Sequence, residues 1–370
     1  MKKLGFGLMR LPVTKKDDPT KIDMKQLGKM ADVFVGNGFT YFDTAYMYHD
    51  GISEKAVKKA IVARYPRESF LLATKLPTMF LKEEGDQERI FAEQLEKCGV
   101  DYFDYYLLHN LNVENYAIAE KFGSFAYVAK LKKEGKIRHM GFSFHDTAEV
   151  LDKILTEHPE AEFVQLQINY LDWDDPTIQS RKCYETAVRH GKKVIVMEPV
   201  KGGTLANLPE EAAKLLKEAH PDWTQAGWAL RFVAGLENIM TVLSGMSNVA
   251  QMEDSVSFMS DCAPLDEKEL ALLRKVTEII NNQKKIGCTA CRYCTEGCPE
   301  NIAIPEYFAL YNSHVTRETD EATLKEQYAK YTKEYGAASY CIKCRSCESA
   351  CPQHLPVTEL LEKVAEHFEK

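Results

Sequence analysis

The run YFDYYLLH (residues 102–109) is almost wholly apolar. Such near-continuous runs are typical of strands buried on both faces of a parallel sheet, whereas a strand with one wet face alternates apolar and polar residues. Seven further runs of this kind occur before residue 260: LGFGLM (4–9), TYFDTA (40–45), FLLATKL (70–76), RHMGFSF (138–144), FVQLQIN (163–169), KVIVME (193–198) and IMTVLSG (239–245). The pattern therefore predicts eight parallel strands.

Longer amphipathic segments lie between these runs, and glycine follows several of them, as at helix ends. They include MKQLGKMADVFVGNG (24–38), EKAVKKAIVARY (54–65), RIFAEQLEKCG (89–99) and TAEVLDKILTEH (147–158). Eight strand–helix units over about 250 residues predict a closed (β/α)8 TIM barrel. A doubly wound open sheet is the alternative, but its G-x-G-x-x-G fingerprint is incomplete in GFGLMR (5–10).

Composition narrows the class of protein. The 370 residues are 45% apolar, which is enough for a full core, and the net charge of −8 comes from interspersed charges without a Lys/Arg run. Nucleic acid is therefore not an expected partner. No segment has the length of a membrane span, and the start MKKLGFGLMRLP is too short and too interrupted for a signal peptide. We expect a cytoplasmic protein without a membrane partner.

The eleven cysteines are distributed unevenly, because eight of them fall after residue 287 in two tight groups. Clustered cysteines in a reducing compartment are expected to bind metal or to be catalytic. Each group reads C-x2-C-x2-C-x3-C-P: Cys288, Cys291, Cys294, Cys298 with Pro299, and Cys341, Cys344, Cys347, Cys351 with Pro352. A charged helix (266–282) precedes the groups and a helical stretch (306–335) separates them. We therefore expect a barrel over 1–264 and a small helical domain over 265–370.

Two kinds of metal site fit cysteines at this spacing. Structural zinc takes four ligands, usually as two separated pairs, so a third cysteine and a C-P in both repeats favour iron–sulfur clusters. Residues 285–356 resemble the bacterial ferredoxin domain that carries two [4Fe–4S] clusters. The resemblance implies crossed ligation, with one cluster held by Cys288, Cys291, Cys294 and Cys351 and the other by Cys341, Cys344, Cys347 and Cys298. We expect this domain to fold only with its clusters.

Polar residues lie at the C-terminal ends of three predicted strands, where the catalytic groups of such barrels lie. The segments DTAYMYHDGISE (43–54), ATKLP (73–77) and YLLHN (106–110) supply Asp43, Tyr48, Lys75 and His109. This set, in this order, resembles the aldo/keto reductase superfamily, with its F-D-T-A-x-x-Y, T-K and L-L-H segments, over residues 1–260. The resemblance implies a nicotinamide-dependent oxidoreductase that reduces a carbonyl compound or oxidises an alcohol.

The chemistry of that reaction explains the residue types. The developing alkoxide needs a proton, and the hydroxyl of Tyr48 can donate it once the ammonium of Lys75 lowers its pKa from a usual value near 10. Asp43 is expected to keep Lys75 charged and in place, and His109 to orient the carbonyl group or assist the proton. Taken singly, these residues have ordinary structural interpretations: Tyr48 as a packing aromatic residue, Asp43 as a cap at a strand end and His109 as a histidine of the core. Together they favour a catalytic set.

The resemblance also implies an extended NADPH or NADH molecule bound without a Rossmann motif. Ser143 and Gln165 are the expected partners of the carboxamide, and Met197 the residue that packs on the nicotinamide ring. Gly202 and Gly203 would allow phosphate to approach the backbone. In the loop SGMSNVAQMEDS (244–255), the expected adenosine contacts are Ser247, Asn248 and Gln251. That loop lacks the Lys or Arg that would clamp a 2′-phosphate, so the choice between NADPH and NADH stays open.

The two expected cofactors differ in electron number. Nicotinamide transfers two electrons as a hydride, whereas an iron–sulfur cluster transfers one. A flavin normally couples them; the sequence has no convincing flavin motif, and barrels can bind flavin without one. Three alternatives follow: electron exchange with a ferredoxin or flavoprotein, a structural role for the clusters, or a barrel that binds a ligand without acting as a carbonyl reductase.

Overall fold

The computed structural model describes residues 2–15 and 18–370. By packing, the chain divides into two units. The first comprises Met1–Val200 and Trp223–Leu270, and the second comprises Lys201–Asp222 and Ala271–Lys370. The second unit therefore includes a segment from the middle of the chain, and the sequence-based boundary between residues 264 and 265 stays a prediction.

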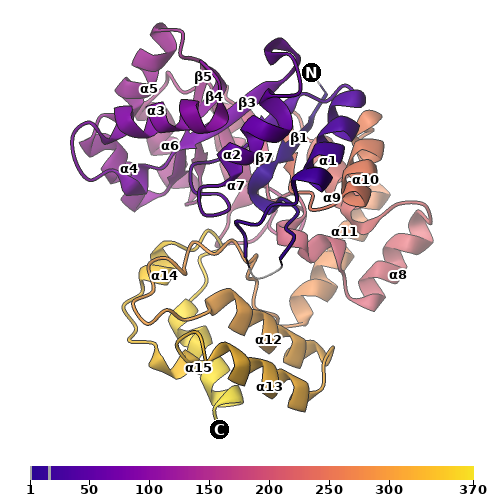
Figure 1. Cartoon of the computed structure of the whole chain (residues 1–370). Coiled ribbons are helices and arrows are strands. Elements are labelled where there is room, and N and C mark those ends of the chain that lie inside the picture. Colours follow the sequence, from indigo (N-terminus) through magenta and orange to yellow (C-terminus); the bar gives the residue numbers. More distant parts are fainter. Residues whose placement is uncertain (1, 16–17) are drawn as a thin grey trace. The chain divides into compact units, whose positions relative to one another are not determined.

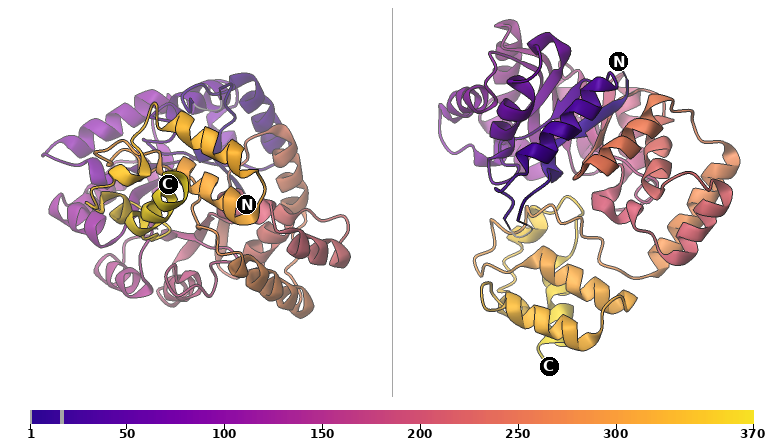
Figure 2. Two further views of the ribbon diagram at one scale, coloured as in Figure 1. Left: turned by 90° about the horizontal axis from the view of Figure 1, so that it is seen from below. Right: turned by 45° about the vertical axis from the view of Figure 1, so that its right-hand side comes forward.

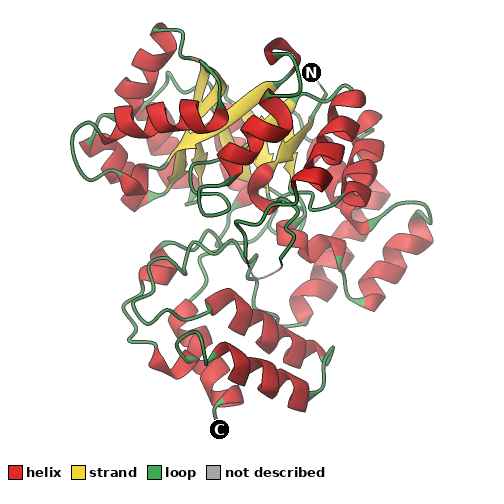
Figure 3. Cartoon of the chain, in the orientation of Figure 1, coloured by secondary structure: helices red, strands yellow, loops and turns green. Residues whose placement is uncertain are grey.

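The first unit contains a closed barrel of eight parallel strands, each hydrogen-bonded to the next along the chain, with β8 pairing back to β1 (Figures 1 and 3). The strands are β1 (Leu4–Gly7), β2 (Tyr41–Asp43), β3 (Leu71–Leu76), β4 (Phe103–Leu111), β5 (Ile137–Phe144), β6 (Phe163–Gln167), β7 (Lys193–Met197) and β8 (Ile239–Ser244). Each of the eight strands overlaps one of the apolar runs predicted to be a strand, so the prediction of a (β/α)8 barrel is confirmed.

Apolar side chains fill the barrel and the layer between strands and helices. Tyr41, Leu107 and Ile195 come from three different strands and belong to one buried cluster, together with Ala73, Tyr105, Phe163 and Leu243. A second, larger cluster joins the outer faces of the strands to the helices. Both faces of the strands are thus covered, which is the physical reason for their near-continuous apolar sequences.

Helices surround the barrel (Figure 3). Those of the first unit up to residue 260 are α1 (Met24–Gly36), α2 (Ser53–Val57), α3 (Asp86–Cys98), α4 (Val113–Lys121), α5 (Ser124–Lys133), α6 (Ala148–Glu157), α7 (Ser180–Arg189), α9 (Gln225–Ala234) and α10 (Val249–Ser260). Helix α8 (Glu210–Ala219) belongs to the second unit. The helix predicted over 54–65 is shorter than expected, because a π-helical turn, η2 (Lys58–Val62), follows α2. The short 3₁₀ turns are η1 (Leu8–Arg10), η3 (Arg67–Ser69), η4 (Thr78–Phe80), η5 (Lys201–Ala206) and η6 (Ala338–Tyr340).

The second unit is helical and has its own buried core. Its helices beyond residue 300 are α12 (Ile304–Thr316), α13 (Glu321–Tyr331), α14 (Ser346–Ser349) and α15 (Val357–Phe368), while α11 (Glu267–Asn282) crosses the division between the units. Helices α12, α13 and α15 lie side by side (Figures 1 and 2). Their core includes Tyr307, Leu324, Tyr328 and Leu361. Arg317, with φ at +56°, ends α12 and divides the predicted helical stretch in two.

No helix in the described residues is long and apolar enough to cross a membrane.

Candidate active site and cluster-binding cavities

Lys75 lies on β3 and is fully buried. Its Nζ donates hydrogen bonds to Asp43 Oδ1 at 2.6 Å and to Tyr48 Oη at 3.2 Å. A third bond, at 2.8 Å, goes to the carbonyl oxygen of Thr44. Since Asp43 ends the neighbouring strand β2 and Tyr48 follows it by five residues, the register of β2 and β3 brings the three side chains together.

Burial opposes charge on both members of the Lys75–Asp43 pair. It raises the pKa of the Asp43 carboxyl and lowers the pKa of the Lys75 ammonium, and their mutual attraction acts against both shifts. A buried ion pair of this kind is held by its additional hydrogen bonds, here those from Nζ to Thr44 and Tyr48. The arrangement places a cationic donor against a phenolic oxygen.

His109 lies on β4, next to the same hydroxyl-bearing ring. The ring centroids of His109 and Tyr48 are 6.0 Å apart and the rings meet edge to face. Burial holds the pKa of His109 well below its usual value of 6.5, and the charges of Lys75 and His145 act in the same direction. The imidazole is therefore neutral at pH 7 and can act as a hydrogen-bond donor or acceptor, but not as a cation.

A buried polar network, which was not predicted from the sequence, holds the backbone of Lys75. Gln94 of α3 is fully buried, and its Nε2 donates to the carbonyl oxygen of Lys75 at 3.0 Å and to Glu54 Oε1 at 2.9 Å. Tyr106 donates its hydroxyl to Gln94 Oε1 at 2.7 Å. In the sequence, Gln94 is only a glutamine within the amphipathic helix predicted over 89–99. A glutamine in such a helix usually lies on its exposed face, so its burial could not be predicted.

Three of the residues expected near nicotinamide lie on neighbouring strands. Ser143 on β5 is paired in register with Gln165 on β6, and Gln165 Nε2 lies 3.5 Å from the sulfur of Met197 on β7. Ser143 Oγ accepts a hydrogen bond from the Asn110 backbone at 2.8 Å. Gln165 is 2% exposed, and within the described residues its Oε1 accepts no hydrogen bond. A buried amide oxygen in this state suits a ligand that donates an N–H group, such as a carboxamide.

The expected adenosine contacts also lie together, at the start of α10. Asn248 caps this helix by accepting from the Gln251 backbone at 2.9 Å, and Gln251 Oε1 accepts from the Ser247 backbone at 2.8 Å. The side chains of Asn248 and Gln251 are thus ordered by local bonds, whereas Ser247 Oγ donates to the carbonyl oxygen of Arg10 at 2.8 Å. Gly202 and Gly203 belong to the second unit, where a side chain at residue 202 would meet Thr289.

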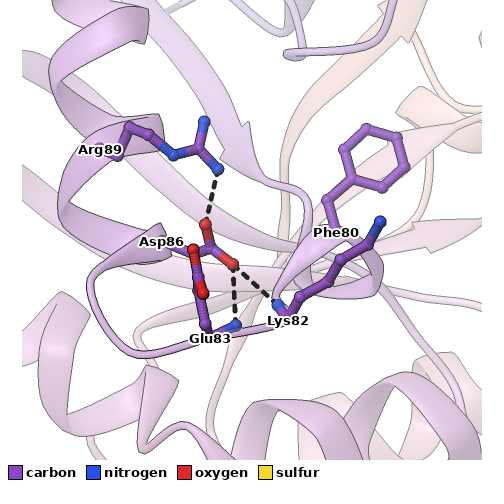
Figure 4. A pocket seen from close by; sticks show the side chains of 5 residues that line it. All are labelled: Phe80, Lys82, Glu83, Asp86 and Arg89. Carbon is purple, nitrogen blue, oxygen red and sulfur yellow. Dashed lines mark hydrogen bonds and ion pairs between the residues drawn. The ribbon is translucent and has the colours of Figure 1, made fainter.

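A surface pocket of about 540 Å³ lies at the start of α3 (Figure 4). Its lining consists of Phe80, Lys82, Glu83, Asp86 and Arg89. The Asp86 carboxylate accepts hydrogen bonds from the backbone N–H groups of Lys82 and Glu83. It also forms an ion pair with Arg89 at 2.7 Å, so the charges of Asp86 and Arg89 compensate each other. The ring of Phe80 meets Tyr46, two residues before Tyr48, at 6.2 Å. None of its lining residues is among the site residues predicted from the sequence.

The eight clustered cysteines line two separate cavities of the second unit, four to each. The first is lined by Cys288, Cys291, Cys294 and Cys351, and the second by Cys298, Cys341, Cys344 and Cys347. Ile304 borders both cavities. The fourth cysteine of each repeat thus lies with the first three of the other repeat, as crossed ligation requires.

The chemistry of these cavities fits iron–sulfur clusters. Burial, reinforced by the neighbouring thiols, raises the pKa of Cys294, and in the same way it raises the pKa of Cys347 to about 11. These two buried thiols therefore resist ionisation unless a cationic centre binds their thiolates. Four thiolates per cavity match the ligand set of a [4Fe–4S] cluster.

An eight-stranded parallel barrel with a buried lysine–tyrosine contact at its strand ends, followed by two four-cysteine cavities, defines an oxidoreductase with an appended iron–sulfur domain. The aldo/keto reductase family matches residues 3–278, and the 4Fe-4S dicluster domain matches residues 287–356. The chain belongs to the aldo/keto reductase family and is an NAD(P)H-dependent oxidoreductase of that family with a C-terminal 4Fe-4S dicluster domain. Both resemblances stated from the sequence are therefore confirmed.

Individual relatives agree with this assignment. L-galactose dehydrogenase of Arabidopsis thaliana is 26% identical over 278 residues, which are 66% of this chain and 82% of the relative. The NADH-specific methylglyoxal reductase of Escherichia coli is 24% identical, covering 66% of this chain and 85% of the relative. The holo form of aldo-keto reductase AKR11C1 from Bacillus halodurans superposes with a TM-score of 0.58 at 27% identity, over 74% of this chain and 91% of that one.

Proposed function

We propose that this protein reduces a small aldehyde or ketone with NADH or NADPH, or oxidises the corresponding alcohol, and that Tyr48 is its proton donor. The observation that carries the proposal is the bond from Lys75 Nζ to Tyr48 Oη, made by the same ammonium that pairs with Asp43. A lysine placed in this way stabilises the tyrosinate that remains after proton transfer. In this proposal Asp43 is a positioning residue for Lys75.

The reaction divides between cofactor and protein. The nicotinamide dinucleotide, when bound, supplies a hydride to the carbonyl carbon. The carbonyl oxygen then takes the proton of Tyr48, so that one C–H and one O–H bond form while the C=O double bond becomes single. Lys75 offsets the charge left on Tyr48, and neutral His109 orients the substrate oxygen by a hydrogen bond.

We assign the dinucleotide contacts to the residues that the sequence predicts for them. Ser143 and Gln165 are proposed to hold the carboxamide, with Met197 against the ring. Gly202 and Gly203 are the proposed phosphate contacts, and Ser247, Asn248 and Gln251 the adenosine contacts. The last three offer hydroxyl and amide groups, which suit the ribose diol of NADH. Fluorescence titration of the purified protein with NADH and NADPH separately decides the preference.

The reductase proposal is tested by removing the phenolic oxygen of Tyr48. Tyr48→Phe should lower kcat for carbonyl reduction by about 100-fold or more, the range of a lost general acid, while dinucleotide affinity is retained. Tyr46→Phe is the matched control, because Tyr46 donates its hydroxyl to Glu93 and not to the lysine. Undiminished turnover in Tyr48→Phe would remove Tyr48 from the mechanism.

We propose that the two cavities hold two [4Fe–4S] clusters in the crossed arrangement, the first on Cys288, Cys291, Cys294 and Cys351 and the second on Cys298, Cys341, Cys344 and Cys347. The grouping of the cysteines within the second unit supports this assignment. When bound, each cluster exchanges single electrons. Iron and sulfide analysis of anaerobically purified protein, with about eight irons per chain expected for two such clusters, is the direct test.

A second candidate function is electron exchange with a ferredoxin or a flavoprotein. The surface of the second unit favours it: Tyr340 and Ile342 flank the ligand Cys341 and are each 61% exposed, and Cys344 is exposed as well. Exposed apolar residues beside a redox centre suit a transient protein contact. Anaerobic mixing with a reduced ferredoxin, a reduced flavoprotein and NADH in separate arms distinguishes these donors by bleaching of the cluster absorbance.

A further inference from the structure

Three consecutive residues that follow β7, Lys201 to Gly203, adopt left-handed backbone conformations. Their φ angles are +45° at Lys201, +62° at Gly202 and +102° at Gly203. A lysine rarely adopts this region, so the surrounding structure holds the backbone of Lys201 there against its intrinsic preference.

Those surroundings are the walls of the first cysteine cavity, and all the residues involved belong to the second unit. Lys201 Nζ donates to Gln353 Oε1 at 2.9 Å, and a Cβ at Gly202 would lie 2.8 Å from Cβ of Thr289. Both Gln353 and Thr289 line the cavity of Cys288, Cys291, Cys294 and Cys351. Glycine is therefore required at 202 for close packing as well as for its φ angle.

The ammonium of Lys201 is shielded from water. Lys201 as a whole is 7% exposed, as is Gln353. The other cationic side chain at this cavity, Arg292, is 53% exposed and forms an ion pair with Glu306. Among the residues that line the second cavity, the cationic side chain is Arg345, which is 74% exposed and lies 3.8 Å from Glu348. Lys343, between Cys341 and Cys344 in the sequence, is 62% exposed and forms an ion pair with Glu362. Lys201 next to the first cavity is thus buried, whereas Arg292, Arg345 and Lys343 are exposed and screened by solvent.

We propose that Lys201 sets the reduction potential of the cluster bound at the first cavity, by placing a buried positive charge beside the Cys351 side of that site. The proposal rests on the cluster assignment made above and adds a residue from outside both cysteine repeats. Lys201 is a positioning and tuning residue and ligates nothing itself.

The physical reason is electrostatic. A cluster that gains one electron becomes more negative by one charge, and a fixed cation in a medium of low dielectric constant stabilises the reduced form more than the oxidised form. The first cluster should therefore be reduced at a higher potential than it would be without Lys201.

The test is a mediated redox titration of the anaerobic holoprotein, followed by electron paramagnetic resonance, on wild type and Lys201→Gln. The neutral amide of glutamine retains a hydrogen bond to Gln353 but removes the charge. At the wild-type midpoint of the first cluster, the ratio of reduced to oxidised cluster should fall about tenfold, which is about 59 mV for a one-electron couple. The second cluster should titrate unchanged.

Three further variants complete the design. Arg345→Gln is the matched control, because it removes an exposed cation at the second cavity, and its effect on either cluster should be much smaller. Lys201→Arg keeps the charge and should titrate close to wild type. If Lys201→Gln does not load its clusters, Lys201→Met decides: its side chain has a similar length without the charge, and the first cluster should again shift to lower potential.

The outcomes separate this inference from the cluster assignment. An iron content below that of two clusters in the wild type would overturn the assignment itself. Full iron content with equal midpoints in wild type, Lys201→Gln and Lys201→Met would overturn only the role of Lys201. A shift of both clusters by the same amount would also contradict the proposal, because it would indicate a general effect on the domain.

Discussion

The ammonium nitrogen of Lys75 lies 3.2 Å from the phenolic oxygen of Tyr48, inside a barrel where Lys75 has no exposed surface. This single contact joins two residues that are 27 positions apart in sequence, one on β3 and the other in the loop after β2. It also gives the phenol a cationic neighbour, which is the condition for proton donation near neutral pH.

Removal of that cation should change the pH dependence of the reaction as well as its rate. Lys75→Met should lower kcat/KM for carbonyl reduction by about 100-fold or more. The pKa of Tyr48 should rise without the ammonium, so the alkaline limb of the pH profile should move to higher pH. Steady-state kinetics between pH 6 and 10 check this. An alkaline limb that stays in place would show that another group titrates there.

The buried ion pair predicts strongly non-additive effects on stability. Asp43→Asn leaves the Lys75 ammonium buried without its counter-charge and should reduce the free energy of unfolding by about 3–5 kcal/mol. In the double variant with Lys75→Met, no charge is left to compensate, so the loss should be smaller than the sum of the two single losses. Denaturant titration of all four proteins measures the coupling. Additive losses would mean that the pair contributes no mutual stabilisation.

His109 should make stability depend on pH in the acidic range. Its pKa in the folded protein lies well below 6.5 because of burial, so below pH 6.5 the unfolded chain binds a proton that the folded chain does not. The free energy of unfolding should therefore fall as the pH falls from about 7 to 5, by up to about 1.4 kcal/mol per pH unit from this residue. His109→Gln should show a shallower slope than wild type in thermal unfolding across this range. Identical slopes would contradict a neutral buried imidazole.

Crossed ligation predicts which cysteine variants behave alike. Cys351→Ser should perturb the same cluster as Cys288→Ser, although the two residues are in different repeats, because both line the first cavity. Cys298→Ser should instead perturb the cluster altered by Cys341→Ser. Electron paramagnetic resonance of the four reduced variants assigns each signal. If variants within one repeat share a signal, the ligation follows the sequence order and not the crossed arrangement.

Gly141 on β5 is predicted to be a stability-determining position of the barrel. A Cβ there would lie 2.4 Å from the carbonyl oxygen of Phe163 on β6, which is backbone and cannot move aside easily. Gly141→Ala should cost about 1–3 kcal/mol of unfolding free energy. Gly36→Ala is the matched control, since Gly36 ends α1 with open space around it and alanine favours the helix. A Tm equal to wild type in Gly141→Ala would contradict the close approach.

Much of this architecture could be predicted from sequence, because the relevant signals are local. A strand buried on both faces reads as a short apolar run wherever it lies, and eight such runs with helices between them leave few alternatives to a barrel. The cysteine spacing is equally local, since one turn of chain holds three corners of a cluster. Asp43, Tyr48, Lys75 and His109 were found because strand ends in a barrel meet at one rim.

The tertiary structure alone decided the contacts that join distant parts of the chain. Nothing near Gln94 in the sequence shows that it turns inward to the Lys75 carbonyl, and nothing near Lys201 shows that it reaches Gln353, 152 residues later. The same holds for Gly202, whose need for glycine comes from Thr289 as well as from its own φ angle. Local sequence sets backbone preference and burial pattern, whereas a polar side chain takes its partner from whatever the folded chain places within hydrogen-bonding distance.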